Sequence, residues 1–331
     1  MRAILCTANG KPEDVLSLAD LPPPALGAGR VRIAVAAAGV NFADSLIVAG
    51  RYQDKPPLPF VPGMEVAGRV LEVGAGVDVC KAGDRVMAVL DQGGFADQAV
   101  ARAEDVFVLP EGLDLVEAAG FPIAYGTSHH GLAVKGGLRA GETLVVLGAA
   151  GGVGLTAVEV GKAIGAKVIA CAGGADKLQV ALERGAFAGI DYKTEPVRDR
   201  VKELTGGLGA DMVYDPVGGP MLEAGLRALK PGGRLMVIGF ASGEVPAIPA
   251  NLLLIKNLAV LGYYWGAWRR LDSPSIRASM IELLDWWRAG RLRPHVSNRL
   301  PLERAAEAIG LLTRRTATGK VVLVLEEGRP A

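Results

Sequence analysis

The sequence predicts an α/β protein with two domains, and three observations support this prediction. Between residues 123 and 262, strand-like and helical stretches alternate, which indicates a doubly wound parallel sheet with right-handed crossovers. Residues 1–122 contain short β-like runs separated by Gly, Pro and Asp turns, as in a small, mostly antiparallel β domain. The late run "GKVVLVLEE" reads as a strand that completes this first domain. We therefore predict a discontinuous β-rich domain, residues 1–122 and 263–331, around an α/β domain, residues 123–262.

Composition excludes several classes of function. The 331 residues carry a net charge of only +1, so no electrostatic footprint for nucleic acid is present. No apolar run approaches the ~20 residues of a membrane span, and "MRAILCTANGK" lacks the layout of a signal peptide. The three cysteines, Cys6, Cys80 and Cys171, are interpreted as small buried hydrophobic residues in a reducing cytoplasm. We expect a cytoplasmic protein without nucleic-acid or membrane partners.

The segment "TLVVLGAAGGVGLTAVEVGKAIGAKVIACAGG", residues 143–174, is the strongest motif. It reads as a strand, a glycine turn, a helix ended by Gly165, and a second buried strand. This unit directs backbone N–H groups and a helix N-terminus at a phosphate. The turn fits G-x-G-x-x-G with Ala149 in the first glycine position. The residues expected to bind a dinucleotide here are Ala150, Gly151, Gly152 and Val153.

The end of the second strand discriminates between NAD and NADP. An NAD site places Asp or Glu there, but this chain has Gly173 and Gly174, followed by Lys177. A 2′-phosphate needs cationic donors, so these residues favour NADPH. Two alternatives stay open: Asp176 reaches the ribose after a shift of one residue, and Lys177 is an ordinary solvated helix residue.

The stretch "SPSIRASMIELLDWWRAG" predicts a helix near the C-terminal end of the chain. Ser273 is the expected N-cap, Pro274 lies in the first turn, and Gly290 follows the last turn. Apolar residues spaced from Ile276 to Trp287 form one stripe, which we interpret as core rather than as a ligand site.

Several motifs in order resemble one family over nearly the whole chain. They are "AAAGVNFADSLIVAGRY", "PFVPGMEVAGRVLEVGAGV", "AGDRV", "AAGGVGLTAVEVGKAIGA", "GAFAGIDYKTE", "MVYDPVGG" and "RRTATGKVVL". The set resembles the zinc-independent medium-chain dehydrogenases/reductases of the quinone oxidoreductase (zeta-crystallin-like) family. The resemblance implies a GroES-like catalytic domain, a Rossmann NADPH-binding domain, and a homodimer joined through the edge strands of the Rossmann domains. The apolar run "LAVLGYYW" is the expected edge.

The resemblance also implies that no metal takes part. Zinc-dependent relatives have a histidine where this chain has Met64, and a thioether is a poor ligand for Zn²⁺. Their first cysteine ligand falls at Asn41, and the cysteine-rich structural zinc lobe is missing from the sequence. Without a Lewis acid, the expected acceptor is one that takes hydride easily. A quinone fits, and an activated C=C bond next to a carbonyl is the other choice.

The resemblance assigns roles around the nicotinamide. Asn41 is expected to orient the nicotinamide ribose or the substrate, and Tyr52 matches a proton-donating tyrosine of related enoyl reductases. The alternative interpretation of Asn41 is a turn residue, and that of Tyr52 is an amphipathic rim residue. Asp44 either holds Asn41 in place or serves as a helix N-terminal carboxylate. Thr127 is expected to meet the nicotinamide, whereas His129 and the adjoining His130 are interpreted as packing residues.

At the adenine end, Tyr192 and Arg315 match family positions that join Lys177 around the 2′-phosphate, with neighbouring Arg314 as the alternative to Arg315. Independently of the family, "VIGFASG" ends a strand, so Gly239 and Phe240 are expected beside the cofactor. The function predicted is an NADPH-dependent oxidoreductase that transfers hydride to a quinone without zinc. The alternatives are an NADPH-dependent enoyl-thioester or enone reductase, and a non-catalytic NADPH-binding protein.

Overall fold

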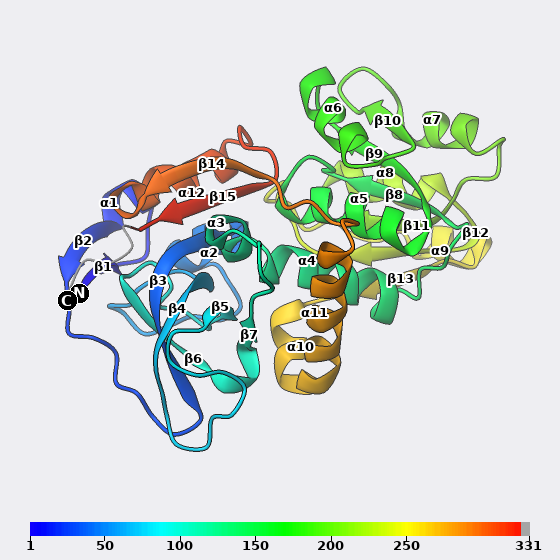
Figure 1. The fold of residues 1–331 in the computed structure, drawn as a ribbon. Coiled ribbons are helices and arrows are strands. Elements are labelled where there is room, and N and C mark those ends of the chain that lie inside the picture. The colour runs from blue at the N-terminus through cyan, green and yellow to red at the C-terminus, as the bar shows by residue number, and fades with distance from the viewer. Residues whose placement is uncertain (326–331) are drawn as a thin grey trace. The chain divides into compact units, whose positions relative to one another are not determined.

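The computed structural model describes residues 1–325, and the chain divides into two compact units. Unit 1 contains Met1–Ile123 and the segment that starts at Pro294, and unit 2 contains Ala124–Arg293 (Figure 1). Residues 326–331 of the predicted β-rich domain lie outside the described residues. The architecture is the predicted one, a β-rich domain and a domain with a doubly wound parallel sheet.

Unit 1 is a mostly antiparallel β structure. A seven-stranded sheet has the order β14-β15-β3-β4-β5-β7, with β6 paired to β3, and β1 and β2 form a separate antiparallel pair. Its strands are β1 (Arg2–Cys6), β2 (Leu16–Asp20), β3 (Arg30–Val40), β4 (Glu65–Val73), β5 (Arg85–Val89), β6 (Gln98–Arg102), β7 (Val106–Val108), β14 (Val296–Pro301) and β15 (Lys320–Val324). Its helices are α1 (Pro12–Val15), α2 (Phe42–Val48), α3 (Leu115–Ala119) and α12 (Ala305–Thr313).

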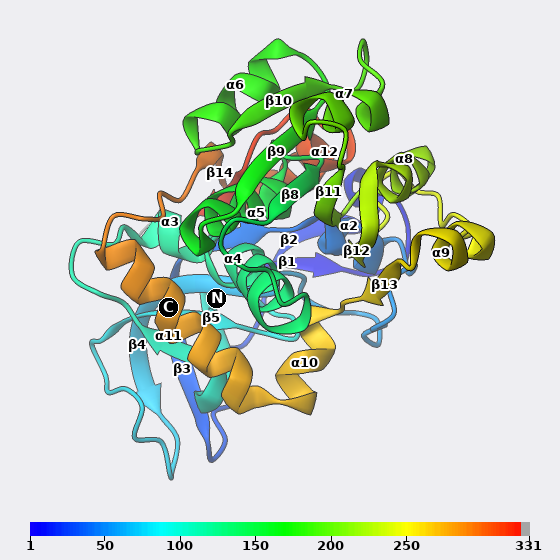
Figure 2. The ribbon, with the colours of Figure 1, turned by 90° about the vertical axis from the view of Figure 1, so that its right-hand side faces the viewer.

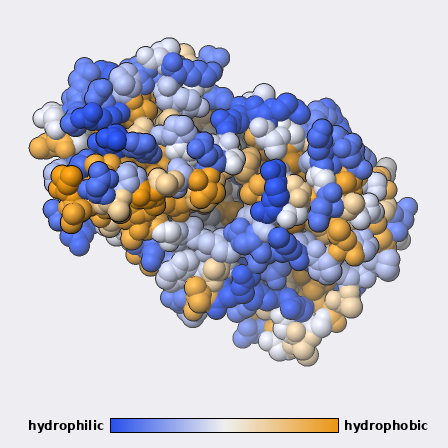
Figure 3. Space-filling view, turned by 180° about the vertical axis from the view of Figure 1, so that it is seen from behind, coloured by the Kyte–Doolittle hydropathy of each residue, from blue (hydrophilic) through white to orange (hydrophobic). Residues whose placement is uncertain are grey.

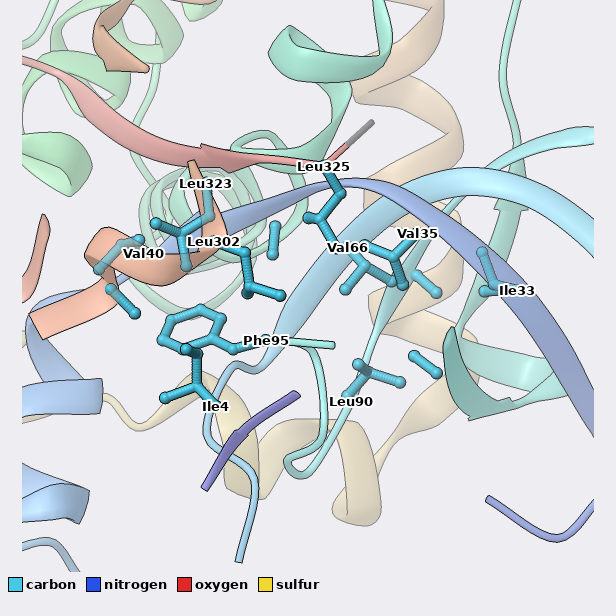
Figure 4. Packing of buried hydrophobic residues seen from close by; sticks show 14 of the residues in the cluster. Ile4, Ile33, Val35, Val40, Val66, Leu90, Phe95, Leu302, Leu323 and Leu325 are labelled. Atoms are coloured by element: carbon cyan, nitrogen blue, oxygen red, sulfur yellow. The ribbon is translucent and has the colours of Figure 1, made fainter. Parts of the chain in front are cut away.

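Strand β15 joins the two ends of the chain within unit 1. It pairs antiparallel with β3 and parallel with β14. Alternating apolar residues of these strands point into one core, where Ile4, Phe95 and Leu302 lie together, as Figure 4 shows. The prediction that "GKVVLVLEE" completes the first domain is thus confirmed for Lys320–Val324.

Unit 2 is built on a six-stranded parallel sheet of order β10-β9-β8-β11-β12-β13. Its strands are β8 (Thr143–Leu147), β9 (Lys167–Ala172), β10 (Ala188–Asp191), β11 (Ala210–Asp215), β12 (Leu229–Val237) and β13 (Ala259–Gly262). Its helices are α4 (Pro122–His129), which continues as a π-helical turn (His130–Lys135), α5 (Gly152–Ile164), α6 (Ala175–Glu183), α7 (Val197–Leu204), α8 (Pro220–Ala228), α9 (Ala250–Lys256), α10 (Trp265–Leu271) and α11 (Ser273–Arg288). The chain order reverses direction between β8 and β11, where such folds place a ligand.

Local signals predicted the end of α5 but placed the cap of α11 one residue too late. Helix α5 ends where expected, because Gly165 adopts φ +96° as its C-cap. Helix α11 is capped one residue earlier than predicted: the carboxylate of Asp272, not Ser273, accepts the backbone N–H of Ser275 at 3.1 Å. The residues "LKPGG" begin β12, where an irregular pairing with β11 accommodates them.

Unit 2 continues beyond Gly262, where the sequence places the end of the α/β domain. Helix α11 lies along the end of α4 (Figure 2), and His129 Nδ1 is 2.8 Å from Ser279 Oγ. His130 Nε2 is 3.0 Å from Ser275 Oγ. These contacts between helices explain why the compact unit extends to Arg293.

Exposed apolar residues lie in the segment that precedes the edge strand β13. On the neighbouring helix α9, Leu254 and Ile255 are 79% and 75% exposed, and Val245 in the preceding loop is 72% exposed. Figure 3 shows hydrophobic side chains gathered over this region, on the left of the view. Among residues 1–325, no helix is both long and apolar enough to cross a membrane.

Candidate active site

The glycine turn between β8 and α5 has its left-handed residue at Gly148, at φ +62°, and Ala149 does not adopt a positive φ. A Cβ at Gly148 would also lie 2.9 Å from Val217 Cγ2. Alanine is therefore compatible with the first position of G-x-G-x-x-G, because the strained conformation falls one residue earlier.

The remaining glycines of the turn have different roles. A Cβ on Gly154 would overlap the carbonyl oxygen of Gly148, so this glycine permits the helix to pack closely on the turn. A Cβ on Gly151 would contact only the same oxygen, at 3.5 Å, and Gly151 is exposed. Packing within residues 1–325 therefore does not require glycine at Gly151, which leaves the start of α5 open to a phosphate.

Tyr192 and Gly173 meet where β9 and β10 end. A Cβ on Gly173 would lie 2.7 Å from the Tyr192 hydroxyl and 3.1 Å from Lys193 Cε. The backbone N–H of Gly174 donates to Asp191 Oδ1 at 3.1 Å, which fixes the turn into α6. The structure thus brings Gly173, Gly174 and Tyr192 together at one edge of the sheet, and Lys177 lies in the first turns of α6.

Lys193 is a residue that sequence reasoning missed. Its side chain passes the same glycine as Tyr192, at the end where the 2′-phosphate was expected. The signal was present in "DYKTE", where a lysine directly follows the tyrosine. Asp191, the last residue of β10, also accepts the backbone N–H of Lys193 at 3.0 Å through Oδ1. That oxygen serves to shape the turn.

Gly239 and Phe240 follow β12 at the same carboxyl edge. A Cβ on Gly239 would meet only Pro216 O, at 3.6 Å, and Phe240 is partly exposed. The adjoining turn after β11 is held by Asp215, whose Oδ1 accepts the N–H groups of Val217 and Gly218 at 2.7 and 2.9 Å. Burial raises the pKa of Asp215. The predicted cofactor residues of four strand ends therefore share one edge of the sheet.

In unit 1, Asn41 is part of a buried polar cluster. Its Nδ2 donates to Glu65 Oε1 at 2.9 Å, and its Oδ1 accepts from Lys320 Nζ at 2.7 Å. Lys320 Nζ also lies 2.8 Å from Glu65 Oε1 and 3.0 Å from Val40 O. Glu65 Oε2 accepts the backbone N–H of Ile123 at 2.9 Å. The side chain of Asn41 is therefore fixed by charged neighbours.

Glu65 and Lys320 were not singled out from the sequence. They are 255 residues apart, and no local pattern connects them. Met64, which precedes Glu65, is partly buried and packs against the core of unit 1. Within residues 1–325, no three His, Cys, Asp or Glu side chains are grouped as a metal site requires.

Asp44 combines both readings that the sequence left open. It lies in the first turn of α2, and its Oδ2 accepts the backbone N–H of Asn41, the N-cap residue, at 2.7 Å. The carboxyl group is buried, with 1% of the residue exposed. Burial raises its pKa to about 7, against the opposing effects of the Asn41 hydrogen bond and of Lys320.

Three further predicted site residues have distinct environments. Tyr52 is partly buried against the core of unit 1, and Thr127 is buried in α4 of unit 2. Arg315 follows α12 in unit 1 and adopts φ +57°, a conformation that glycine usually supplies after a helix. Its backbone N–H donates to Leu312 O at 3.0 Å. Arg315 is thus a non-glycine residue in a backbone conformation that side chains other than hydrogen disfavour.

The two adjacent histidines have packing partners, in agreement with their interpretation. His129 bonds to Ser279, and burial lowers its pKa to about 4. His130 Nδ1 lies 2.9 Å from the Tyr263 hydroxyl, and burial lowers its pKa as well. Both rings therefore stay neutral in the folded protein near pH 7.

Comparisons with known proteins agree with this geometry. Residues 27–111 match the family described as alcohol dehydrogenase GroES-like domain, and residues 152–286 match the family described as zinc-binding dehydrogenase. Quinone oxidoreductase-like protein 2 homolog of Nematostella vectensis is 42% identical over 97% of this chain and 88% of its own. Escherichia coli quinone oxidoreductase complexed with NADPH is 31% identical, with a TM-score of 0.91 over 98% and 100% of the two chains. Thermus thermophilus quinone oxidoreductase, solved also as its complex with NADPH, is 36% identical, with a TM-score of 0.84 over the same shares.

Proposed function

Because the chain belongs to the quinone oxidoreductase family of the medium-chain dehydrogenases/reductases, we propose that it is an NADPH-dependent reductase of quinones. The observation that carries this proposal is the carboxyl edge of the parallel sheet in unit 2. There, two glycines take the place of the acidic residue of an NAD site, and lysines follow them. The relatives solved with NADPH support the same cofactor.

The residues present fit a bound NADPH. Gly151, Gly152 and Val153, after Ala150, offer the start of α5 to the pyrophosphate, since packing does not require a bare Cα at Gly151. Lys177 and Tyr192, together with Arg315, would bind the 2′-phosphate, and Gly173 and Gly174 leave room for the ribose. The remaining part of NADPH would be contacted by Gly239, Phe240 and Thr127. When bound, NADPH supplies a hydride equivalent to the electron acceptor.

The substrate end of the reaction is assigned to Asn41 and Tyr52. Asn41 would donate a hydrogen bond to an oxygen of the acceptor or of the nicotinamide ribose. Either solvent or Tyr52 would supply the proton, because a phenol is mostly protonated at neutral pH. No metal is assigned: the donors beside Asn41 are a carboxylate already paired with an ammonium, and Met64 packs in the core. We further propose a homodimer through the β13 edge and a cytoplasmic location.

The test is an acceptor panel with NADPH and NADH compared side by side. The proposal expects turnover with simple ortho- or para-quinones and a preference for NADPH. Failure to reduce any quinone, or a preference for NADH, would contradict it. Tight NADPH binding without turnover on any acceptor would instead favour a non-catalytic NADPH-binding protein.

Tyr52 also favours a second candidate, an enoyl-thioester or enone reductase. Reduction of a C=C bond needs a proton on carbon or on an enolate oxygen, which a phenol can supply. Tyr52→Phe separates the two functions. A large loss of kcat with an enone acceptor favours this alternative, whereas quinone turnover should change little.

A further inference from the structure

The ion pair between Lys320 and Glu65 is buried, with 6% and 0% of the residues exposed. All three hydrogens of the ammonium have acceptors, namely Val40 O, Asn41 Oδ1 and Glu65 Oε1. Desolvation usually offsets the attraction within a buried ion pair, so hydrophobic residues of equal volume would often be as stable. Stability therefore does not explain why this pair is present, and its contact with Asn41 suggests another role.

The pair fixes which way the Asn41 amide faces. An ammonium can only donate and a carboxylate can only accept, so Oδ1 must face Lys320 and Nδ2 must face Glu65. The flipped amide would place N–H against N–H and oxygen against oxygen. The other hydrogen of Nδ2 has no acceptor among residues 1–325, and Asn41 is 8% exposed.

Two glycines keep the space that this arrangement needs. A Cβ on Gly39 would overlap the Glu65 carboxylate, and a Cβ on Gly120 would lie 3.1–3.2 Å from three carbons of the Lys320 side chain. The cluster is thus enclosed by backbone from β3 and from the end of α3. Within these walls, the side chains of Lys320 and Glu65 have little freedom to move away from Asn41.

We propose that Lys320 is a positioning residue that, with Glu65, holds Asn41 as a hydrogen-bond donor toward the carbonyl oxygen of the electron acceptor. The inference rests on the proposed function, because it takes the acceptor to be a quinone or an enone. A cation on the amide oxygen also polarises the amide, which strengthens the remaining N–H as a donor. Oxygen gains negative charge as such acceptors are reduced, so this donor stabilises the transition state more than the ground state.

A double-mutant cycle tests the coupling between the two residues. Lys320→Met, Asn41→Ala and the double variant are compared for kcat and KM with NADPH and 1,4-benzoquinone, with thermal unfolding followed in parallel. The matched control is Lys256→Met, which removes a lysine in unit 2 whose ammonium also bonds to backbone carbonyls. Lys320→Met leaves Glu65 uncompensated, so Lys320→Met/Glu65→Gln replaces it if folding fails.

The proposal expects Lys320→Met to lower kcat about tenfold in the wild-type background and less than about twofold in the Asn41→Ala background, with KM changing little. An equal decrease of kcat in the wild-type and Asn41→Ala backgrounds would overturn the proposal. A decrease of kcat that only follows the fraction of unfolded protein would overturn it too. The same loss of kcat in Lys256→Met would overturn it as well.

A second measurement does not depend on activity. The chain has five asparagines, so ¹⁵N-asparagine labelling gives five side-chain amide signals, and Asn41→Ala identifies the one from Asn41. The Asn41 signal should move toward the position of a solvated amide in Lys320→Met and stay in place in Lys256→Met. An unchanged signal in Lys320→Met would overturn the inference. Absence of turnover in the wild type would defeat the proposed function alone, and the amide signal would still decide whether Lys320 positions Asn41.

Discussion

The carboxylate of Asp44 accepts the backbone N–H of Asn41 through Oδ2 at 2.7 Å. Its other oxygen, Oδ1, is buried. Lys320 is close enough to lower the pKa of Asp44, but burial dominates and raises it to about 7. Between about pH 4 and pH 7, the folded protein therefore favours the protonated form of Asp44, whereas the unfolded chain favours the ionised form.

This difference makes the contribution of Asp44 to stability depend on pH. Its pKa is higher in the folded state, so ionisation of the buried carboxyl group lowers the free energy of unfolding. This destabilisation is absent below about pH 4 and complete above about pH 7. We expect Asp44→Asn to match the wild type near pH 4. At pH 8 the variant should have a free energy of unfolding larger by up to ~4 kcal/mol, from the 1.36 kcal/mol of each pKa unit.

The measurement is denaturant unfolding of the wild type and of Asp44→Asn from pH 4 to pH 8. The quantity reported at each pH is the difference between their free energies of unfolding. Comparing the two proteins at each pH is needed because His129 also titrates in this interval. Its pKa is lowered to about 4 in the folded state, so its contribution to the free energy of unfolding increases as the pH rises from about 4. Asp78→Asn, a change at an exposed carboxylate of unit 1, is the control and should give a flat difference. A flat profile for Asp44→Asn would show that Asp44 is ionised at no unusual cost.

A pair of glycine variants separates packing from ligand binding in the turn before α5. Gly154→Ala would force a methyl group onto the carbonyl oxygen of Gly148, and we expect a loss of roughly 1–3 kcal/mol in unfolding free energy. Gly151→Ala meets no such obstacle at φ −79° and should unfold like the wild type. Its methyl group would nevertheless stand where the pyrophosphate is proposed to bind. We expect weaker NADPH binding in titration calorimetry, and unaltered affinity would contradict the assigned phosphate site.

Local sequence patterns were sufficient for the parts of the fold in which neighbours along the chain decide the structure. The strand, turn and helix of residues 143–164 follow from periodicity and glycine placement, and Gly165 ends the helix as expected. Alanine at position 149 is compatible with the motif because the left-handed residue of the turn is Gly148. The local pattern missed the cap at Asp272, one residue before the serine that was chosen.

Contacts between distant residues could not be predicted in this way. The partner of Glu65 lies 255 residues later in the chain, and Lys320 looked like an ordinary residue at the start of a strand. Likewise, the buried bonds from α11 to His129 and His130, which extend unit 2 to Arg293, depend on helices that no motif connects. Such pairs are found only when the folded chain brings them together.

The conformation of Arg315 provides a clean test of the 2′-phosphate site. Arg315→Gly removes the side chain but keeps the left-handed backbone, so stability should be unchanged or higher by several tenths of a kcal/mol. We expect the Kd for NADPH to rise about tenfold, equivalent to ~1.4 kcal/mol, while the Kd for NADH stays constant. Arg314→Ala is the matched control at the preceding residue.

Lys193→Gln extends this test to the residue that sequence reasoning missed. Its side chain passes Gly173 together with Tyr192, so we expect a selective loss of NADPH affinity in the same assay. Lys177→Gln should behave similarly. Equal losses for NADPH and NADH would mean that these lysines act on the shared part of the cofactor rather than on the 2′-phosphate.

The last prediction concerns assembly of the protein through the β13 edge. Leu254 and Ile255 project from α9 beside this edge at 79% and 75% exposure, a combination that would invite aggregation if nothing covered it. Sedimentation of the wild type should therefore give a dimer. Leu254→Glu/Ile255→Glu should raise the dimer dissociation constant more than about tenfold, because charge is costly in an apolar interface. Leu208→Glu, at a residue of unit 2 that is 73% exposed and distant in sequence from this edge, should remain dimeric. A monomeric wild type, or equal dissociation of both variants, would remove the β13 edge as the interface.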